Sequence, residues 1–164
     1  VNGVVRRLDG PHLWVGWRSR HKSVAPGQMD NAVAGGIPAG LTPEQTLIKE
    51  AEEEASLPAE LAARAVPAGR VSYVMANDEG LRRDVLHLYD LDIPEGITPC
   101  PNDEEVERFE LIPAREALRI VAETDEVKFN VNLVLTDFAL RHGLLAHLTE
   151  EERRHLRAGL DQVG

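Results

Sequence analysis

The fold of this chain is decided by the stretch GGIPAGLTPEQTLIKEAEEEASL, residues 35–57. A glycine-rich loop runs directly into a segment that begins as α-helices do. Thr42 suits the N-cap, Pro43 the first helical position and Glu44 the acidic first turn. Pro58 ends the segment, because proline cannot continue a helix. We therefore expect a glycine loop followed by one helix that ends near residue 57.

Three glutamates crowd one face of this helix. Glu50, Glu53 and Glu54 stand at positions i, i+3 and i+4, so their Cβ atoms are about 5–6 Å apart and their charges repel. A hard divalent cation with oxygen ligands would offset that repulsion. The opposite face carries Ile48 and Ala51, which can pack on a core. The alternative is a solvated acidic surface helix, the usual outcome for a run of charges.

The spacing of these residues resembles the Nudix box, G-x5-E-x7-R-E-U-x-E-E-x-G-U, where U is aliphatic. Counted from Gly35, Glu50 falls at the glutamate after the arginine position, Glu53 and Glu54 form the later pair, and Leu57 is the last aliphatic residue. The resemblance implies an α/β fold, a Nudix-type α/β/α sandwich with a mixed sheet. It implies a hydrolase of small diphosphates in which Glu50, Glu53, Glu54 and the Gly35 carbonyl hold Mg²⁺ or Mn²⁺. Glu53 and Glu54 would also serve catalysis.

Three positions depart from the pattern. Leu41 stands where the first glutamate belongs, Lys49 replaces the arginine and Ser56 replaces the final glycine. The arginine of the family holds the carboxylates in place. Lys49 supplies charge without a planar fork, and we place it in the substrate-binding set. Because of Leu41, the identity of the general base stays open.

Other stretches resemble the Nudix branch related to thiamine pyrophosphokinase. They are WVGWRS (14–19), PGQMDN (26–31), VAGG (33–36), DEGL (78–81), LYDL (88–91), DEEVERF (103–109), DF (137–138) and RHGL (141–144). We therefore expect a Nudix hydrolase domain over residues 1–147 and a C-terminal helical extension over residues 148–164. The branch implies hydrolysis of thiamine diphosphate, or its oxidised analogues, to the monophosphate. Rival substrates are ADP-ribose and NADH, and the rival function is a catalytically silent ligand sensor.

Outside the box, members of the superfamily commonly use a further carboxylate as ligand or base. We place it at Glu105, with Glu107 second and in the substrate-binding set, since both share one face of an expected strand. The alternative is an exposed acidic turn. Arg18, at a strand end, is expected to clamp a phosphate or else to form a structural ion pair. Asp30 is expected to orient Arg18 or a substrate amine.

The remaining pattern alternates strands and helices. Strands are expected over residues 1–8, 12–18, 31–34, 69–77, 85–91 and 106–111, with a turn over residues 78–80. Helices are expected over residues 58–65, 113–123 and 128–142, and after a capping box over residues 149–152. Such a mixture favours a sheet with helices on both faces.

Composition bounds the function. The 164 residues suit one domain, and a formal net charge of −10 argues against a nucleic-acid binder. No apolar run approaches the roughly 20 residues of a membrane span. The single Cys100 suits a reducing compartment, so we expect a cytoplasmic protein with a small-molecule substrate. The resemblance leaves a homodimer open, and no segment identifies an interface.

Overall fold

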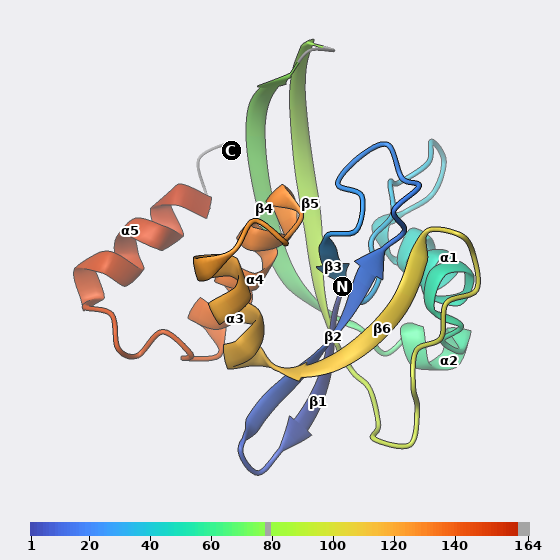
Figure 1. Cartoon of the computed structure of the whole chain (residues 1–164), viewed down its shortest axis with the longest axis horizontal. Helices are drawn as coiled ribbons and strands as arrows, with labels where there is room; N and C mark the ends of the chain where they lie inside the picture. Colours follow the sequence, from blue (N-terminus) through green and yellow to red (C-terminus); the bar gives the residue numbers. More distant parts are fainter. Residues whose placement is uncertain (78–79, 161–164) are drawn as a thin grey trace.

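A six-stranded mixed sheet forms the centre of this computed structural model, which describes residues 1–77 and 80–160 (Figure 1). Its strands are β1 (Asn2–Arg7), β2 (Gly10–Arg18), β3 (Met29–Asn31), β4 (Val66–Asn77), β5 (Gly80–Asp92) and β6 (Val106–Pro113). β1 runs parallel to β5, whereas the pairs of β2 with β1, β3 and β6, and of β4 with β5, are antiparallel. The mixed sheet expected from the sequence is confirmed.

The sheet opens between β3 and β5. β2 pairs with β1 through residues 10–14 and with β3 through residues 15–17, so these two strands share one edge of β2 while β6 occupies the other. β1 reaches β5 only through the partners of residues 2–4, which are residues 90–92. In the described part of the chain no ladder joins β3 to residues 82–89 of β5. The candidate site lies at this opening.

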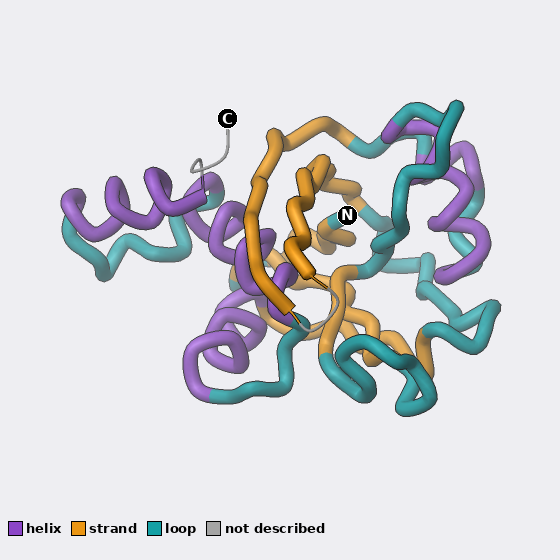
Figure 2. Tube along the Cα trace, turned by 90° about the horizontal axis from the view of Figure 1, so that it is seen from above, coloured by secondary structure: helices purple, strands orange, loops and turns teal. Residues whose placement is uncertain are grey.

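Helices cover both faces of the sheet (Figure 1). One side carries α1 (Pro43–Ala55) and α2 (Ala59–Ala62), and the other carries α3 (Ala114–Glu123) and α4 (Phe129–Arg141). α5 (Glu150–Leu160) packs against α4 and β4, and Figure 2 shows it at the outer edge of that side. The expected α/β/α sandwich is confirmed.

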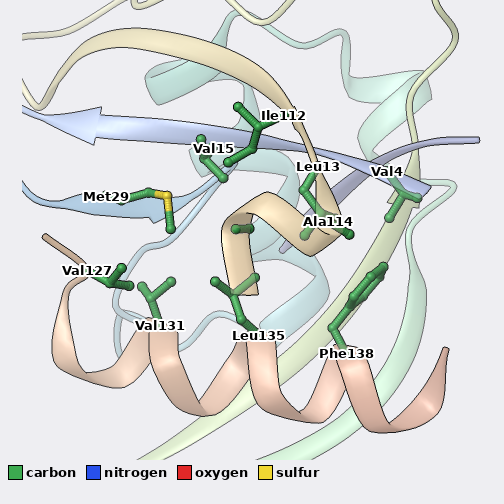
Figure 3. Close-up of a cluster of buried hydrophobic side chains, with 11 residues drawn as sticks. Val4, Leu13, Val15, Met29, Ile112, Ala114, Val127, Val131, Leu135 and Phe138 are labelled. Carbon is green, nitrogen blue, oxygen red and sulfur yellow. The ribbon is translucent and has the colours of Figure 1, made fainter. Parts of the chain in front are cut away.

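Strand alternation divides the core into two layers. Leu13 and Val15 of β2 pack with Leu135 and Phe138 of α4, as Figure 3 shows. Trp14, between them in the sequence, packs on the opposite side in the cluster that includes α1. This is the period of two that a strand imposes. Each face of β2 therefore anchors one helical layer, and α1 is held against the sheet by its own apolar face.

The two ends of α1 follow local rules. A capping box closes its start, because the Thr42 hydroxyl accepts from the Gln45 N–H at 3.2 Å while the Thr42 N–H donates to Gln45 Oε1 at 2.9 Å. At its end the Leu57 N–H donates to the Ala51 carbonyl at 3.0 Å, the bond of a Schellman motif. Ser56 takes the left-handed conformation there, with φ 52° and ψ 30°. Ser56 thus occupies the backbone geometry for which the box specifies glycine.

Replacing Ser56 by Gly is expected to stabilise the protein by about 0.5–1 kcal/mol. A non-glycine residue pays roughly 1–2 kcal/mol in the left-handed region, and the extra chain entropy of glycine offsets about 0.5–1 kcal/mol of the gain. Urea denaturation of the two proteins measures the difference. Ser23→Gly, at an exposed position without positive φ, is the control and should be neutral or destabilising. Equal effects of the two substitutions would contradict the argument.

Several expected boundaries were wrong. β3 covers residues 29–31 rather than 31–34, because the Ala34 N–H donates to Glu54 of α1 instead of joining a ladder. β4 and β5 are longer than expected, and α2 is shorter than the expected helix over residues 58–65. The expected turn over residues 78–80 falls partly on residues 78–79, which lie outside the described residues. Among residues 1–77 and 80–160, no helix has the length and apolar character needed to span a bilayer.

Candidate functional site

The glycine loop (residues 35–40) lies against the acidic face of α1. A Cβ placed on Gly35 would lie 2.4 Å from Cδ of Glu50 and 2.7 Å from its Oε2. Such distances are far below van der Waals contact, so only glycine lets this carboxylate lie on the loop backbone. A Cβ on the neighbouring Gly36 would meet no atom within 4 Å. The close approach is therefore specific to Gly35.

Glu54 is buried behind the loop. Its side chain accepts a hydrogen bond from the Ala34 N–H at 3.0 Å, and the residue is 7% exposed. Burial raises the pKa of Glu54 to about 7, and the negative charges of Asp30, Glu50 and Glu105 push in the same direction. The hydrogen bond from Ala34 only partly opposes the shift. A positive charge delivered to this place would stabilise the ionised carboxylate.

The positive charge of Lys49 partly neutralises the carboxylates on the outer part of the acidic face of α1. Its ammonium lies 3.3 Å from Oε1 of Glu50 and also contacts Oε2 of Glu53. Hydrogen bonding to Glu53, and less strongly to Glu50, raises the pKa of Lys49. Lys49 therefore contacts two of the three carboxylates that the sequence assigns to a metal.

The three glutamates share one helix face without converging on one point. Within residues 1–77 and 80–160, no group of three or more His, Cys, Asp or Glu side chains is gathered so as to hold a metal ion. The reason is that Glu53 turns to Lys49 and Glu54 turns to the Ala34 amide. The donor chemistry nevertheless fits a hard cation, since carboxylate oxygens of Glu50 and Glu54 lie beside the loop backbone.

Of Glu105 and Glu107, the two candidate carboxylates outside the Nudix box, Glu105 is the one whose charge acts on the glutamates of α1. Its charge contributes to the raised pKa of Glu54, and its Oε1 lies 2.8 Å from Nζ of Lys22. Glu107 instead accepts a hydrogen bond from the Arg20 N–H at 2.9 Å. Both carboxylates fasten β6 to the loop after β2, and only Glu105 acts on the carboxylate face of α1.

Arg18 is engaged inside the protein. Its Nη1 donates to Oδ2 of Asp30 at 2.9 Å and its Nη2 to the carbonyl of Val24 at 2.9 Å. Arg18 is 11% exposed and Asp30 8% exposed at their side chains. In this structure Arg18 and Asp30 therefore form an ion pair with each other.

Sequence reasoning missed Lys128, whose Nζ lies 2.8 Å from Oδ2 of the same Asp30. Residues 126–128 run alongside β3: the Met29 N–H donates to the Glu126 carbonyl at 2.7 Å, and the Lys128 N–H donates to the Met29 carbonyl at 3.1 Å. This pairing places Lys128 beside Asp30. Lys128 and Asp30 lie 98 positions apart, and no local motif announces their contact.

A cleft of about 440 Å³ occupies the opening in the sheet. Its walls are the glycine loop and α1 on one side and β5 on the other, and its lining includes Gly35, Gly36, Thr46, Glu50, Arg82, Arg83, His87, Tyr89, Asp30 and Lys128. The Thr46 hydroxyl is buried and has no hydrogen-bond partner in the described part of the chain. The arginines of β5 were also missed, because only the register of β5 brings them to the cleft.

Comparison with known proteins agrees with this geometry. The model of the NUDIX domain matches residues 1–133. The chain is 43% identical over 145 residues to Nudix hydrolase 20, chloroplastic, and to Nudix hydrolase 24, chloroplastic, both of Arabidopsis thaliana. Those alignments cover 88% of this chain but only 39% and 40% of the two relatives, so the chain spans less than half their length.

Solved structures show the same fold at low sequence identity. The NUDIX domain of Shewanella oneidensis NrtR, complexed with ADP ribose, matches with a TM-score of 0.63 and 14% identity, over 85% of this chain and 84% of that chain. A Caenorhabditis elegans Ap4A hydrolase matches with a TM-score of 0.59 and 14% identity, over 90% and 95% of the two chains. With the family model covering most of its length and the glycine loop set against an acidic helix, this chain belongs to the Nudix family.

Proposed function

We propose that this chain is a metal-dependent hydrolase that cleaves the diphosphate linkage of a small nucleoside- or cofactor-like molecule. The observation that carries the proposal is the contact of the Glu50 carboxylate with the side-chain-free Gly35, with Glu54 buried behind it. This arrangement forms one wall of the 440 Å³ cleft, which suits a small ligand. A loop and a helix that served only as surface would not need glycine at that one position.

The glutamates would have two roles, metal binding and proton transfer. Glu50, Glu54 and the Gly35 carbonyl would hold Mg²⁺ or Mn²⁺, with Glu53 joining once it leaves Lys49. When bound, the ion neutralises phosphate charge and polarises the phosphoryl group. Glu105, whose charge acts on Glu54, would accept the proton of a water that attacks phosphorus in line with the leaving oxygen.

The finer substrate assignment is thiamine diphosphate or its oxidised analogues, and it rests on the branch resemblance over residues 14–144. ADP-ribose is the second substrate, because the NUDIX domain of NrtR was crystallised with ADP ribose. One observation favours a different function, a catalytically silent ligand sensor: Lys49 contacts both Glu50 and Glu53. In such a protein this internal cation would stay in place.

A product-release assay tests the proposal. With Mg²⁺ present, the wild type is expected to release monophosphate from at least one member of a panel of thiamine diphosphate, its oxidised analogues, ADP-ribose and NADH. EDTA and Glu53→Gln should each remove turnover, because EDTA withdraws the metal ion and the substitution removes a carboxylate that would hold it. Glu52→Gln is the matched control on the exposed side of α1 and should leave turnover unchanged. Metal binding without turnover on any member would favour the sensor.

A further inference from the structure

Residues 82–89 of β5 all line the cleft, and alternate residues belong to opposite faces of the strand. Arg83, Val85, His87 and Tyr89 share the face on the side of α1, because Tyr89 packs in the cluster that contains Leu47. The pairing of β5 with β4 runs without a register shift from Gly80 to Leu88. The alternation is thus unbroken along this wall.

The contacts of Tyr89 show that this face of β5 is turned toward α1. Its hydroxyl donates to Oε1 of Glu44, in the first turn of α1, at 2.7 Å, and its ring packs in the core cluster that contains Leu47. His87 lies close enough to help lower the pKa of Glu44, although the hydrogen bond from Tyr89 is the larger cause. Arg83 continues the same face toward the β4–β5 hairpin, which projects beyond the rest of the sheet (Figure 1).

Arg83 differs from its neighbour in having no internal partner. Arg82 donates to Oδ2 of Asp84 at 2.6 Å, and Asp84 also accepts from the Tyr73 hydroxyl. Arg83 is exposed, and within residues 1–77 and 80–160 its side chain makes no hydrogen bond or ion pair. An unpaired guanidinium offers five N–H donors in a plane and a face that stacks on aromatic rings.

The cleft is therefore polarised. Its α1 wall presents the carboxylate of Glu50 beside the glycine loop, whereas its β5 wall presents Arg83 and His87. Asp30 and Lys128, and likewise Arg82 and Asp84, also line the cleft but are paired with each other, which leaves the guanidinium of Arg83, among the described residues, as the unpaired positive charge of the β5 wall. A substrate that fits both walls carries its diphosphate at the α1 wall and a group rich in hydrogen-bond acceptors at the β5 wall.

We infer that Arg83 determines substrate specificity by binding a planar heterocycle with hydrogen-bond acceptors, carried by the substrate at the end remote from its diphosphate. This inference rests on the proposed function and deepens it. An alkyl diphosphate would leave the Arg83 donors unused, and a group with only donors would oppose them. Arg83 binds and orients the substrate and takes no part in the chemical step.

Kinetics with Arg83→Ala and Arg83→Lys test the inference. The substrates are ADP-ribose and thiamine diphosphate, which carry heterocycles, and methyl diphosphate, which carries none. For Arg83→Ala the KM of the heterocyclic substrate is expected to rise about tenfold, the effect of losing roughly 1.4 kcal/mol of binding. Its kcat should hold, and the kinetics with methyl diphosphate should not change. Arg83→Lys should recover only part of the KM, because lysine lacks the planar fork.

Arg64→Ala is the matched control, since Arg64 is also exposed and does not line the cleft. An equal loss in Arg64→Ala, or an equal loss with methyl diphosphate, would show a general effect of charge and overturn the inference. No change in KM would also overturn it. If no diphosphate is hydrolysed, the proposed function fails. The role of Arg83 is then decided by calorimetric binding of ADP-ribose, thiamine diphosphate and methyl diphosphate to the wild type and to Arg83→Ala in EDTA. Weaker binding of the heterocyclic ligands alone to the variant supports the inference, and unchanged binding refutes it.

Discussion

Replacing Glu54 by Gln is expected to lower kcat for diphosphate hydrolysis by at least about 10–100-fold, because Glu54 is a proposed metal ligand and disturbing even the groups around such a ligand has an effect of this size. Glutamine still offers a carbonyl oxygen to the Ala34 N–H, so the loop keeps its anchor. It carries no negative charge with which to hold a metal ion. Steady-state kinetics at saturating Mg²⁺ measures the loss, and Glu52→Gln, on the exposed side of the same helix, should retain activity.

The same substitution is expected to stabilise the metal-free protein at high pH. Burial raises the pKa of Glu54 from its ordinary value of 4.5 to about 7, so between these values the folded state binds more protons than the unfolded state. The stability that Glu54 contributes is then fully present below the unfolded pKa of 4.5 and is lost as the pH rises through about 7. At 1.36 kcal/mol per pKa unit, the loss is about 3 kcal/mol.

Urea denaturation in EDTA near pH 5 and again above pH 8 measures this linkage. The difference in unfolding free energy between Glu54→Gln and wild type should shift in favour of the variant as the pH rises. Glu52→Gln, whose side chain is exposed, should follow the wild type at both pH values. A variant that loses activity and is destabilised equally at both pH values would show that Glu54 is not a buried charge held for a cation.

Gly35→Ala is expected to weaken Mg²⁺ or Mn²⁺ binding by about 10–100-fold, the range for disturbing groups that orient a metal ligand. The new Cβ would lie 2.4 Å from Cδ of Glu50, so either the carboxylate or the loop backbone has to move. Because the clashing atoms lie at the far end of the flexible Glu50 side chain, which can swing away, the loss of folding stability should be small compared with the loss of metal affinity. Hydrolysis should fall with the metal affinity.

Gly36→Ala provides the comparison one residue away. Its Cβ would meet no atom within 4 Å, so metal affinity and activity should stay near those of the wild type. Calorimetric titration with Mn²⁺ and thermal unfolding of the three proteins separate the loss of binding from the loss of fold. Equal behaviour of the two variants would contradict the role of Gly35 as the place where Glu50 meets the loop.

The features that could be predicted from the sequence by itself are those set by residues only a few positions apart. The limits of α1 follow from the Thr42 capping box and from the turn at Ser56, both of which involve residues no more than a few positions apart. The common face of Glu50, Glu53 and Glu54 follows from helical periodicity alone. The period of two along β2 likewise puts Trp14 and Trp17 on opposite sides of the strand, and they lie in two different core clusters.

Tertiary structure decided which charges meet, because Coulomb and hydrogen-bond contacts depend on distances that no local pattern encodes. The pairing of residues 126–128 with β3 places Lys128 beside Asp30. The pairing of β6 with β2 places Glu105 where its negative charge raises the pKa of Glu54. The register of β5 brings Arg83 to the cleft wall opposite Glu50. The sequence by itself therefore determined the acidic helix and its loop, whereas the folded sheet determined what faces them across the cleft.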